Sequence, residues 1–136
     1  MKPIVVYFSR TGNTKRLAQA IAEATNAPIY DTAQADPEKI AQYDLFIFGC
    51  PVEGASPAKE AAEYIAALPA ASSKKAILFT TYRLFGNERT MKAIEKDLAA
   101  KGYETLLKVS KKGMKPEEPA DFSKVLSEVN QTLQKI

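Results

Sequence analysis

The chain alternates short, unbroken apolar runs with longer segments whose apolar residues recur every three or four positions. The apolar runs cover residues 4–8, 45–49, 76–81 and 103–109, and residues 28–31 form a shorter strand candidate. Unbroken β-branched and aromatic runs are typical of strands covered on both faces. Strands that alternate with helices predict an α/β fold with a parallel sheet, right-handed crossovers and helices on both faces.

The helical segments show apolar stripes that can cover such a sheet. The stripes are Leu17, Ala18, Ile21 and Ala22; Ala61, Ala62, Ile65 and Leu68; Met91, Ile94 and Leu98; and Phe122, Val125, Leu126, Val129 and Leu133. Residues 37–42 have room for one or two helical turns. Ser56 is expected to cap the second long helix with Pro57 at its first position, and Asn87 and Asp121 to cap the next two. Gly102 is expected to end the third helix in a left-handed conformation.

Composition narrows the classes of function. The 136 residues carry a formal charge of +3 and include one cysteine and no histidine. This length predicts a single domain over residues 1–136. Without histidine, zinc hydrolase and Ser-His-Asp chemistry are excluded within the chain. We expect Cys50 to be a small buried hydrophobe, the chain to cross no membrane and lie in the cytoplasm, and its dispersed charge not to bind nucleic acid.

Ligands of such sheets bind beyond the carboxyl ends of the strands, which directs attention to residues 9–14, 51–57 and 80–87. The first loop, Ser9-Arg10-Thr11-Gly12-Asn13-Thr14, joins a buried strand to an amphipathic helix. Its hydroxyls, the free N–H groups of a helix start and a glycine that allows close approach suit one phosphate group. Two interpretations stay open: a phosphate cradle, or polar residues that only cap the helix. Arg10 either pairs with the phosphate or points to solvent.

The segment from Tyr7 to Ala18 resembles the FMN phosphate loop of flavodoxins, a Ser/Thr-x-Thr-Gly-x-Thr pattern matched by Ser9, Thr11, Gly12 and Thr14. The resemblance extends along the chain as element order and length. It implies a flavodoxin-like doubly wound three-layer sandwich with a five-stranded sheet in the order 2-1-3-4-5, non-covalent FMN and electron transfer. The cofactor-binding residues expected on this basis are Ser9, Arg10, Thr11, Gly12, Asn13, Thr14, Pro51, Val52, Glu53, Gly54, Thr81, Tyr82, Phe85 and Gly86. No catalytic or metal-binding residue is expected.

The second and third loops are expected to hold the flavin ring between them. Tyr82 or Phe85 is the candidate stacking residue on one face, and Pro51 or Val52 covers the other because the aromatic residue often found there in flavodoxins is missing. The resemblance also implies a peptide flip on reduction, which we place at Gly54. Flavodoxins are mostly acidic, whereas this chain has a pI near 8.9. A positive side chain such as Arg83 facing the ring predicts a less negative low potential.

The resemblance favours a one-electron carrier, a monomer whose partners are redox proteins: a reductase or ferredoxin-type donor and an acceptor enzyme. Two alternatives remain open at this point. One is an NAD(P)H-dependent FMN or quinone reductase on the same fold, and the other is a flavin-free module that binds a phosphate or mononucleotide. The basic residues Lys108, Lys111, Lys112 and Lys115 are expected to form a solvated loop rather than a docking site.

Overall fold

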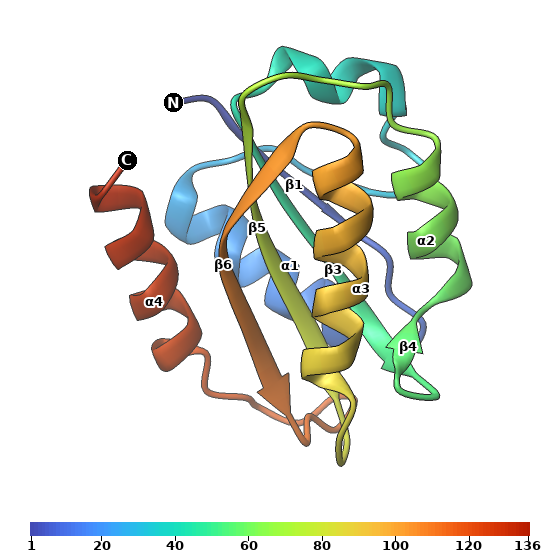
Figure 1. Cartoon of the computed structure of the whole chain (residues 1–136). Helices are drawn as coiled ribbons and strands as arrows, with labels where there is room; N and C mark the ends of the chain where they lie inside the picture. The colour runs from blue at the N-terminus through green and yellow to red at the C-terminus, as the bar shows by residue number, and fades with distance from the viewer.

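The computed structural model describes residues 1–136 as a three-layer α/β structure (Figure 1). Its sheet contains β1 (Pro3–Tyr7), β2 (Ile29–Asp31), β3 (Leu45–Glu53), β5 (Lys74–Tyr82) and β6 (Tyr103–Lys112) in the order β2-β1-β3-β5-β6. Each neighbouring pair along this path is parallel. The predicted order 2-1-3-4-5 is therefore confirmed for the five parallel strands.

Four α-helices cover the two faces of this sheet. Helices α1 (Asn13–Thr25) and α4 (Ser123–Gln134) lie on one face, and α2 (Lys59–Ala66) and α3 (Asn87–Ala100) lie on the other (Figure 1). The 3₁₀ helix η1 (Pro37–Gln42) places Ile40 in the core on the side of α2 and α3. The loops that follow the five parallel strands therefore all lie at the same edge of a sheet that is buried on both faces.

Strand β3 shows why unbroken apolar runs predict this arrangement. Leu45 and Ile47 pack toward α1 and α4, whereas Phe46 and Phe48 pack toward α2 and α3, and all four are at most 1% exposed. Successive side chains of a strand point to opposite faces, so a strand between two helical layers needs apolar residues at every position. Burial of each such side chain stabilises the fold by about 1.5–3 kcal/mol.

Several predicted boundaries are wrong. Ser56 does not cap α2, because Ser56–Pro57 forms β4, a two-residue strand antiparallel to the end of β3, and Ala58 precedes the helix. Asn87 is the first residue of α3, and Gly86 takes the capping position with φ 98°.

Other boundaries hold in substance. Phe122 and not Asp121 takes the capping position of α4, but the Asp121 carboxylate accepts a hydrogen bond from the Ser123 N–H at 2.9 Å and so stabilises the start of the helix. Gly102 is left-handed just after α3, at φ 94°, as expected. The expected position of Ala62 on the buried side of α2 is wrong. Ala62 is exposed, and Tyr64 lies on the buried side instead. None of the helices is long and apolar enough to cross a membrane.

Candidate functional site

The loops that follow β1, β3, β5 and β6 surround an open cavity of about 420 Å³ at the carboxyl edge of the sheet. Such a volume lies in the range of small-molecule and cofactor sites. The lining residues come from all four loops: Arg10, Thr11, Asn13, Pro51, Val52, Glu53, Thr81, Tyr82, Arg83, Met114, Lys115 and Pro116. The structure therefore brings together residues from the three loops selected from sequence and from one further loop.

The first loop presents unused backbone donors. Gly12, with φ 96°, turns the chain into α1. The Ser9 hydroxyl oxygen accepts hydrogen bonds from the N–H groups of Gly12 and Lys15, both at 3.1 Å. It therefore fixes the loop internally, as the capping interpretation expects. In this loop the N–H groups that have no protein acceptor are those of Ser9, Arg10, Thr11, Asn13 and Thr14. Because they gather at a helix N-terminus, they form an anion-binding arrangement.

Three side chains of this loop differ in availability. Thr11 is exposed, lines the cavity and makes no hydrogen bond within the protein. Thr14 is buried, and its hydroxyl lies 2.7 Å from that of Thr81 at the end of β5. Asn13 donates from its amide nitrogen to the Met114 carbonyl at 3.1 Å, while its buried amide oxygen has no partner. A buried acceptor without a donor beside a cavity fits a ligand that carries hydroxyl groups.

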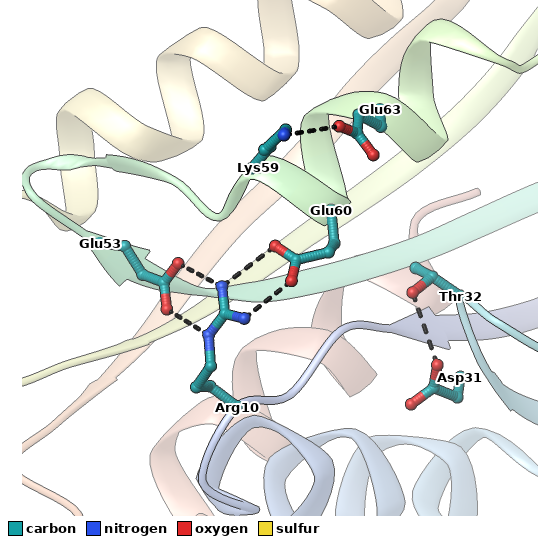
Figure 2. Close-up of polar contacts among 7 residues, drawn as sticks. All are labelled: Arg10, Asp31, Thr32, Glu53, Lys59, Glu60 and Glu63. Carbon is teal, nitrogen blue, oxygen red and sulfur yellow. Dashed lines mark hydrogen bonds and ion pairs between the residues drawn. The ribbon is translucent and has the colours of Figure 1, made fainter.

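Arg10 is exposed and lines the cavity, and its guanidinium is bound by two carboxylates of the protein. Its guanidinium donates to both oxygens of Glu53, at 2.7 and 2.8 Å, and to both oxygens of Glu60, at 2.7 and 3.0 Å (Figure 2). It also lies over the Phe8 ring, with 4.8 Å from Cζ to the ring centroid. Its hydrogen bonds to Glu53 and Glu60 raise the pKa of Arg10, and those with Arg10 lower the pKa of Glu60. Arg10 thus ties the first loop to the second loop and to α2.

The second loop is a two-residue hairpin between β3 and β4. Its central residues, Gly54 and Ala55, both have positive φ, 59° and 60°, which is the pattern of a type I′ turn. The left-handed conformation costs a non-glycine residue about 1–2 kcal/mol. Gly86 packs against this turn, since a Cβ placed on Gly86 would lie 2.8 Å from the Ala55 Cα. The second and third loops are therefore in direct contact.

The third loop places its two aromatic residues differently. Tyr82 lines the cavity described above, whereas Phe85 lies at a second, more open hollow together with Val52, Gly54, Ala55, Arg83 and Leu84. Leu84 and Phe85 are 72% and 73% exposed. Of the two expected stacking candidates, Tyr82 is the one beside the first loop. Pro51 and Val52 line the cavity from the second loop.

Sequence reasoning missed the fourth wall of the cavity. Met114, Lys115 and Pro116 lie in the polar stretch after β6, which the sequence suggested was only a surface loop. The N–H of Gly113 donates to the Tyr82 carbonyl at 2.8 Å and so brings this segment beside the third loop. The available signal was position: the stretch follows the carboxyl end of a strand, at the same edge as the other three loops.

Cys50 lies next to the site but faces the core. Its side chain is fully buried among the residues that pack against α2 and α3, as predicted. Burial raises the pKa of the thiol to about 12. At neutral pH Cys50 is therefore a neutral packing residue, not a nucleophile.

Comparison with known proteins decides the family. Residues 4–126 match the family model described as Flavodoxin domain. An uncharacterized protein of Methanocaldococcus jannaschii, MJ0298, is 31% identical over 108 residues, which cover 78% of this chain and 71% of that protein. The chain belongs to the flavodoxin family.

Solved structures agree with the fold of this flavodoxin. The flavodoxin of Streptococcus pneumoniae superposes with a TM-score of 0.83 over 100% of both chains at 14% identity. Oxidised flavodoxin 2 of Bacillus cereus gives 0.81 over 100% of both chains at 21% identity. Two-electron reduced flavodoxin of Megasphaera elsdenii gives 0.76 over 98% of this chain and 99% of that one, at 21% identity. Family membership implies a flavin cofactor, typically FMN.

Proposed function

We propose that this flavodoxin binds FMN without a covalent bond in the cavity between the first and third loops and carries electrons between redox proteins. The observation that supports this most directly is the group of unused N–H donors at the start of α1, beside a cavity of cofactor size. When bound, FMN supplies the chemistry by accepting and releasing electrons. The protein's own residues bind it, orient it and set the charge around it.

The first loop suits the phosphate through neutral donors. The five free backbone N–H groups and the Thr11 hydroxyl surround the start of α1, where the helix dipole favours an anion. Arg10 is committed to Glu53 and Glu60 and does not act as the phosphate's counter-ion. We therefore assign Arg10 a structural role in the site and Thr11 a direct one.

The remaining walls suit the ribityl chain and the ring. The unpartnered oxygen of Asn13 accepts from a hydroxyl, and Tyr82 offers a flat aromatic surface. Pro51 and Val52 provide apolar surface from the second loop. Phe85, exposed at the second hollow, is placed for a contact at the rim rather than with the first loop.

The test compares FMN with riboflavin, which lacks the phosphate. Thr11→Ala should weaken the binding of FMN by about 1.5–3 kcal/mol, the contribution of a hydrogen bond to a charged group. The affinity for riboflavin should stay nearly unchanged. Thr25→Ala, at the other end of α1, is the matched control and should alter neither affinity. Equal loss of both ligands in Thr11→Ala would contradict the phosphate role. Failure of the wild-type protein to bind FMN in calorimetry would favour a flavin-free module.

The expected partners are redox proteins, and the charges at the rim indicate which kind. Arg83 and Lys115 line the cavity and Lys112 lies beside Tyr82 in the sheet register, and none of the three forms an ion pair. Lys108, by contrast, is neutralised by Glu95 at 2.7 Å. Unpaired cations beside the exposed Leu84 favour a partner with an acidic face, so we assign Lys112 and Lys115 to a docking surface in place of the solvated loop expected from the sequence.

Electron exchange with two probe proteins tests the carrier role. An acidic ferredoxin should exchange electrons with the FMN-loaded protein faster than a basic cytochrome c does, and added salt should slow the first reaction. Lys112→Glu should slow the ferredoxin reaction, whereas Lys135→Glu, the same charge change at the end of the chain, should not. Rapid steady consumption of NADPH with a quinone as acceptor would instead identify a reductase.

A further inference from the structure

The turn at Gly54 and Ala55 adopts a conformation that its own sequence does not favour. Type I′ turns prefer Asn-Gly, Asp-Gly or Gly-Gly at the two central positions, whereas glycine in the first position alone is typical of type II′. In a II′ turn only the first central residue has positive φ. Gly-Ala is thus a II′ sequence, yet Ala55 has φ 60°. The two forms differ by rotation of the peptide plane between Gly54 and Ala55.

A strained residue persists only where its surroundings determine it, and two contacts do so here. On one side, Gly86 admits the Ala55 backbone so closely that no side chain fits between them. On the other side, the residue that opens the turn, Glu53, is held by both of its carboxylate oxygens on Arg10. The same guanidinium is anchored to Glu60 in the first turn of α2. The turn is therefore held between α2 and the third loop.

Geometry makes this bridge specific. Arg10 uses Nε, Nη1 and Nη2 for four hydrogen bonds of 2.7–3.0 Å, and its planar fork matches two carboxylates at once (Figure 2). Lys59 and Glu63, a neighbouring pair on α2, are joined only by a single 3.7 Å contact and are more exposed. Of these ion pairs, only those of Arg10 reach the hairpin, through Glu53.

We infer that Arg10 is a positioning residue that, by bridging Glu53 to Glu60, holds the Gly54–Ala55 turn in its strained I′ form. Release of the bridge lets the Gly54–Ala55 peptide rotate and the turn move to II′. The bridge thereby sets the balance between the two orientations of a peptide at the rim of the cavity. Its effect on bound flavin rests on the proposed function, whereas the bridge and the turn are properties of the protein alone.

The primary test is NMR on the flavin-free protein, so its result is independent of whether FMN binds. A I′ turn gives a weak NOE between the Gly54 Hα and the Ala55 amide proton, and a II′ turn gives a strong one. We expect the weak pattern in the wild type and the strong pattern in Arg10→Met, with the II′ population raised about tenfold, in line with the left-handed penalty at Ala55. Glu60→Gln should give an NOE of intermediate intensity. Glu63→Gln, the same charge change one turn along α2, should give the wild-type intensity.

A rescue variant distinguishes strain from general loosening. Arg10→Met combined with Ala55→Gly should restore the wild-type pattern, because glycine adopts φ 60° without penalty. A wild-type NOE pattern in Arg10→Met would overturn the inference, as would equal shifts in Glu60→Gln and Glu63→Gln or a failure of Ala55→Gly to restore the turn. In FMN-loaded protein, Arg10→Met should also shift the midpoint potentials relative to Glu63→Gln; unchanged potentials alongside a moved turn would contradict only the link to flavin.

Discussion

The hydroxyl of Thr14 lies 2.7 Å from the hydroxyl of Thr81, and this bond joins the first turn of α1 to the end of β5. Both side chains are buried, so each hydroxyl depends on the other for a partner. The bond fixes α1 relative to β5, the strand that carries the third loop. The orientation of two walls of the cavity therefore depends on one pair of threonines.

Removal of both members of this pair should lower the free energy of unfolding by less than the sum of the two single losses. Thr14→Val leaves the Thr81 hydroxyl buried without a partner and should lower the free energy of unfolding by about 1–3 kcal/mol. Thr81→Val should behave similarly, and the double variant should lose less than the sum of the two, since no polar group is then orphaned. Urea unfolding of the three variants checks this. Simple additivity would show that the two hydroxyls do not depend on each other.

The contact between Gly86 and Ala55 predicts a second effect on stability. Gly86→Ala introduces a Cβ 2.8 Å from the Ala55 Cα at φ 98°, so it meets both a left-handed penalty and a clash with backbone. Gly113→Ala is the control, because Gly113 also has positive φ but its Cβ would face open space. We expect Gly86→Ala to lower the free energy of unfolding by about 1–3 kcal/mol more than Gly113→Ala does, which is the usual cost of overpacking. Thermal or urea unfolding measures the difference, and equal losses would mean that the third loop moves away freely.

Cys50 should resist thiol reagents in the folded protein. Its side chain is fully buried and its pKa is raised to about 12, first by burial and further by the nearby negative charge of Glu53. At pH 8, modification by a chromogenic disulfide reagent should be slow and should become rapid in urea, at a rate that follows unfolding. Rapid reaction of the native protein would show that the region behind the second loop opens locally.

The bridge from Arg10 to Glu60 predicts how stability depends on pH. Hydrogen bonds from Arg10 lower the pKa of Glu60 in the folded state, whereas the unfolded chain has the ordinary value. The stabilisation is therefore fully present above the ordinary pKa and is lost as the pH falls through the lowered one. Between about pH 5 and pH 3 the wild type should lose stability more steeply than Glu60→Gln. Glu63→Gln should keep the wild-type slope, and identical slopes in the wild type and Glu60→Gln would contradict the coupling.

The layers and strand order follow from local patterns, whereas the site depends on contacts between distant residues. Unbroken runs such as residues 45–49 and the stripe at Leu17 identify buried strands and helices because the periods 2 and 3.6 are properties of each segment alone. Ser56 and Pro57 carry a helix-cap pattern, yet pairing with β3 makes them a strand. Capping preference is worth about 1 kcal/mol, which a tertiary contact readily overcomes.

Within the site, the same division holds. The placement of Thr11 at a helix start was predictable from the six-residue pattern around it. The partners of Arg10 were not, because Glu53 and Glu60 lie 43 and 50 residues away along the chain. The left-handed Ala55 was also unpredictable, since the Gly-Ala pair by itself favours another turn. These departures from local preference concentrate where the loops meet around the cavity, as expected where backbone strain is retained for function.

The charge on Arg83 predicts the direction of the redox potential once FMN is bound. Arg83 lines the cavity without an ion-pair partner, and a positive charge there favours the reduced, more negative cofactor. Arg83→Ala should make the lower midpoint potential more negative by about 20–60 mV, since 59 mV corresponds to tenfold in a one-electron equilibrium. Arg89→Ala removes the same charge from α3, outside the cavity lining, and should cause a smaller shift. Anaerobic titration with a reductant measures both, and equal shifts in the two variants would show that net charge, not the position of Arg83, controls the potential.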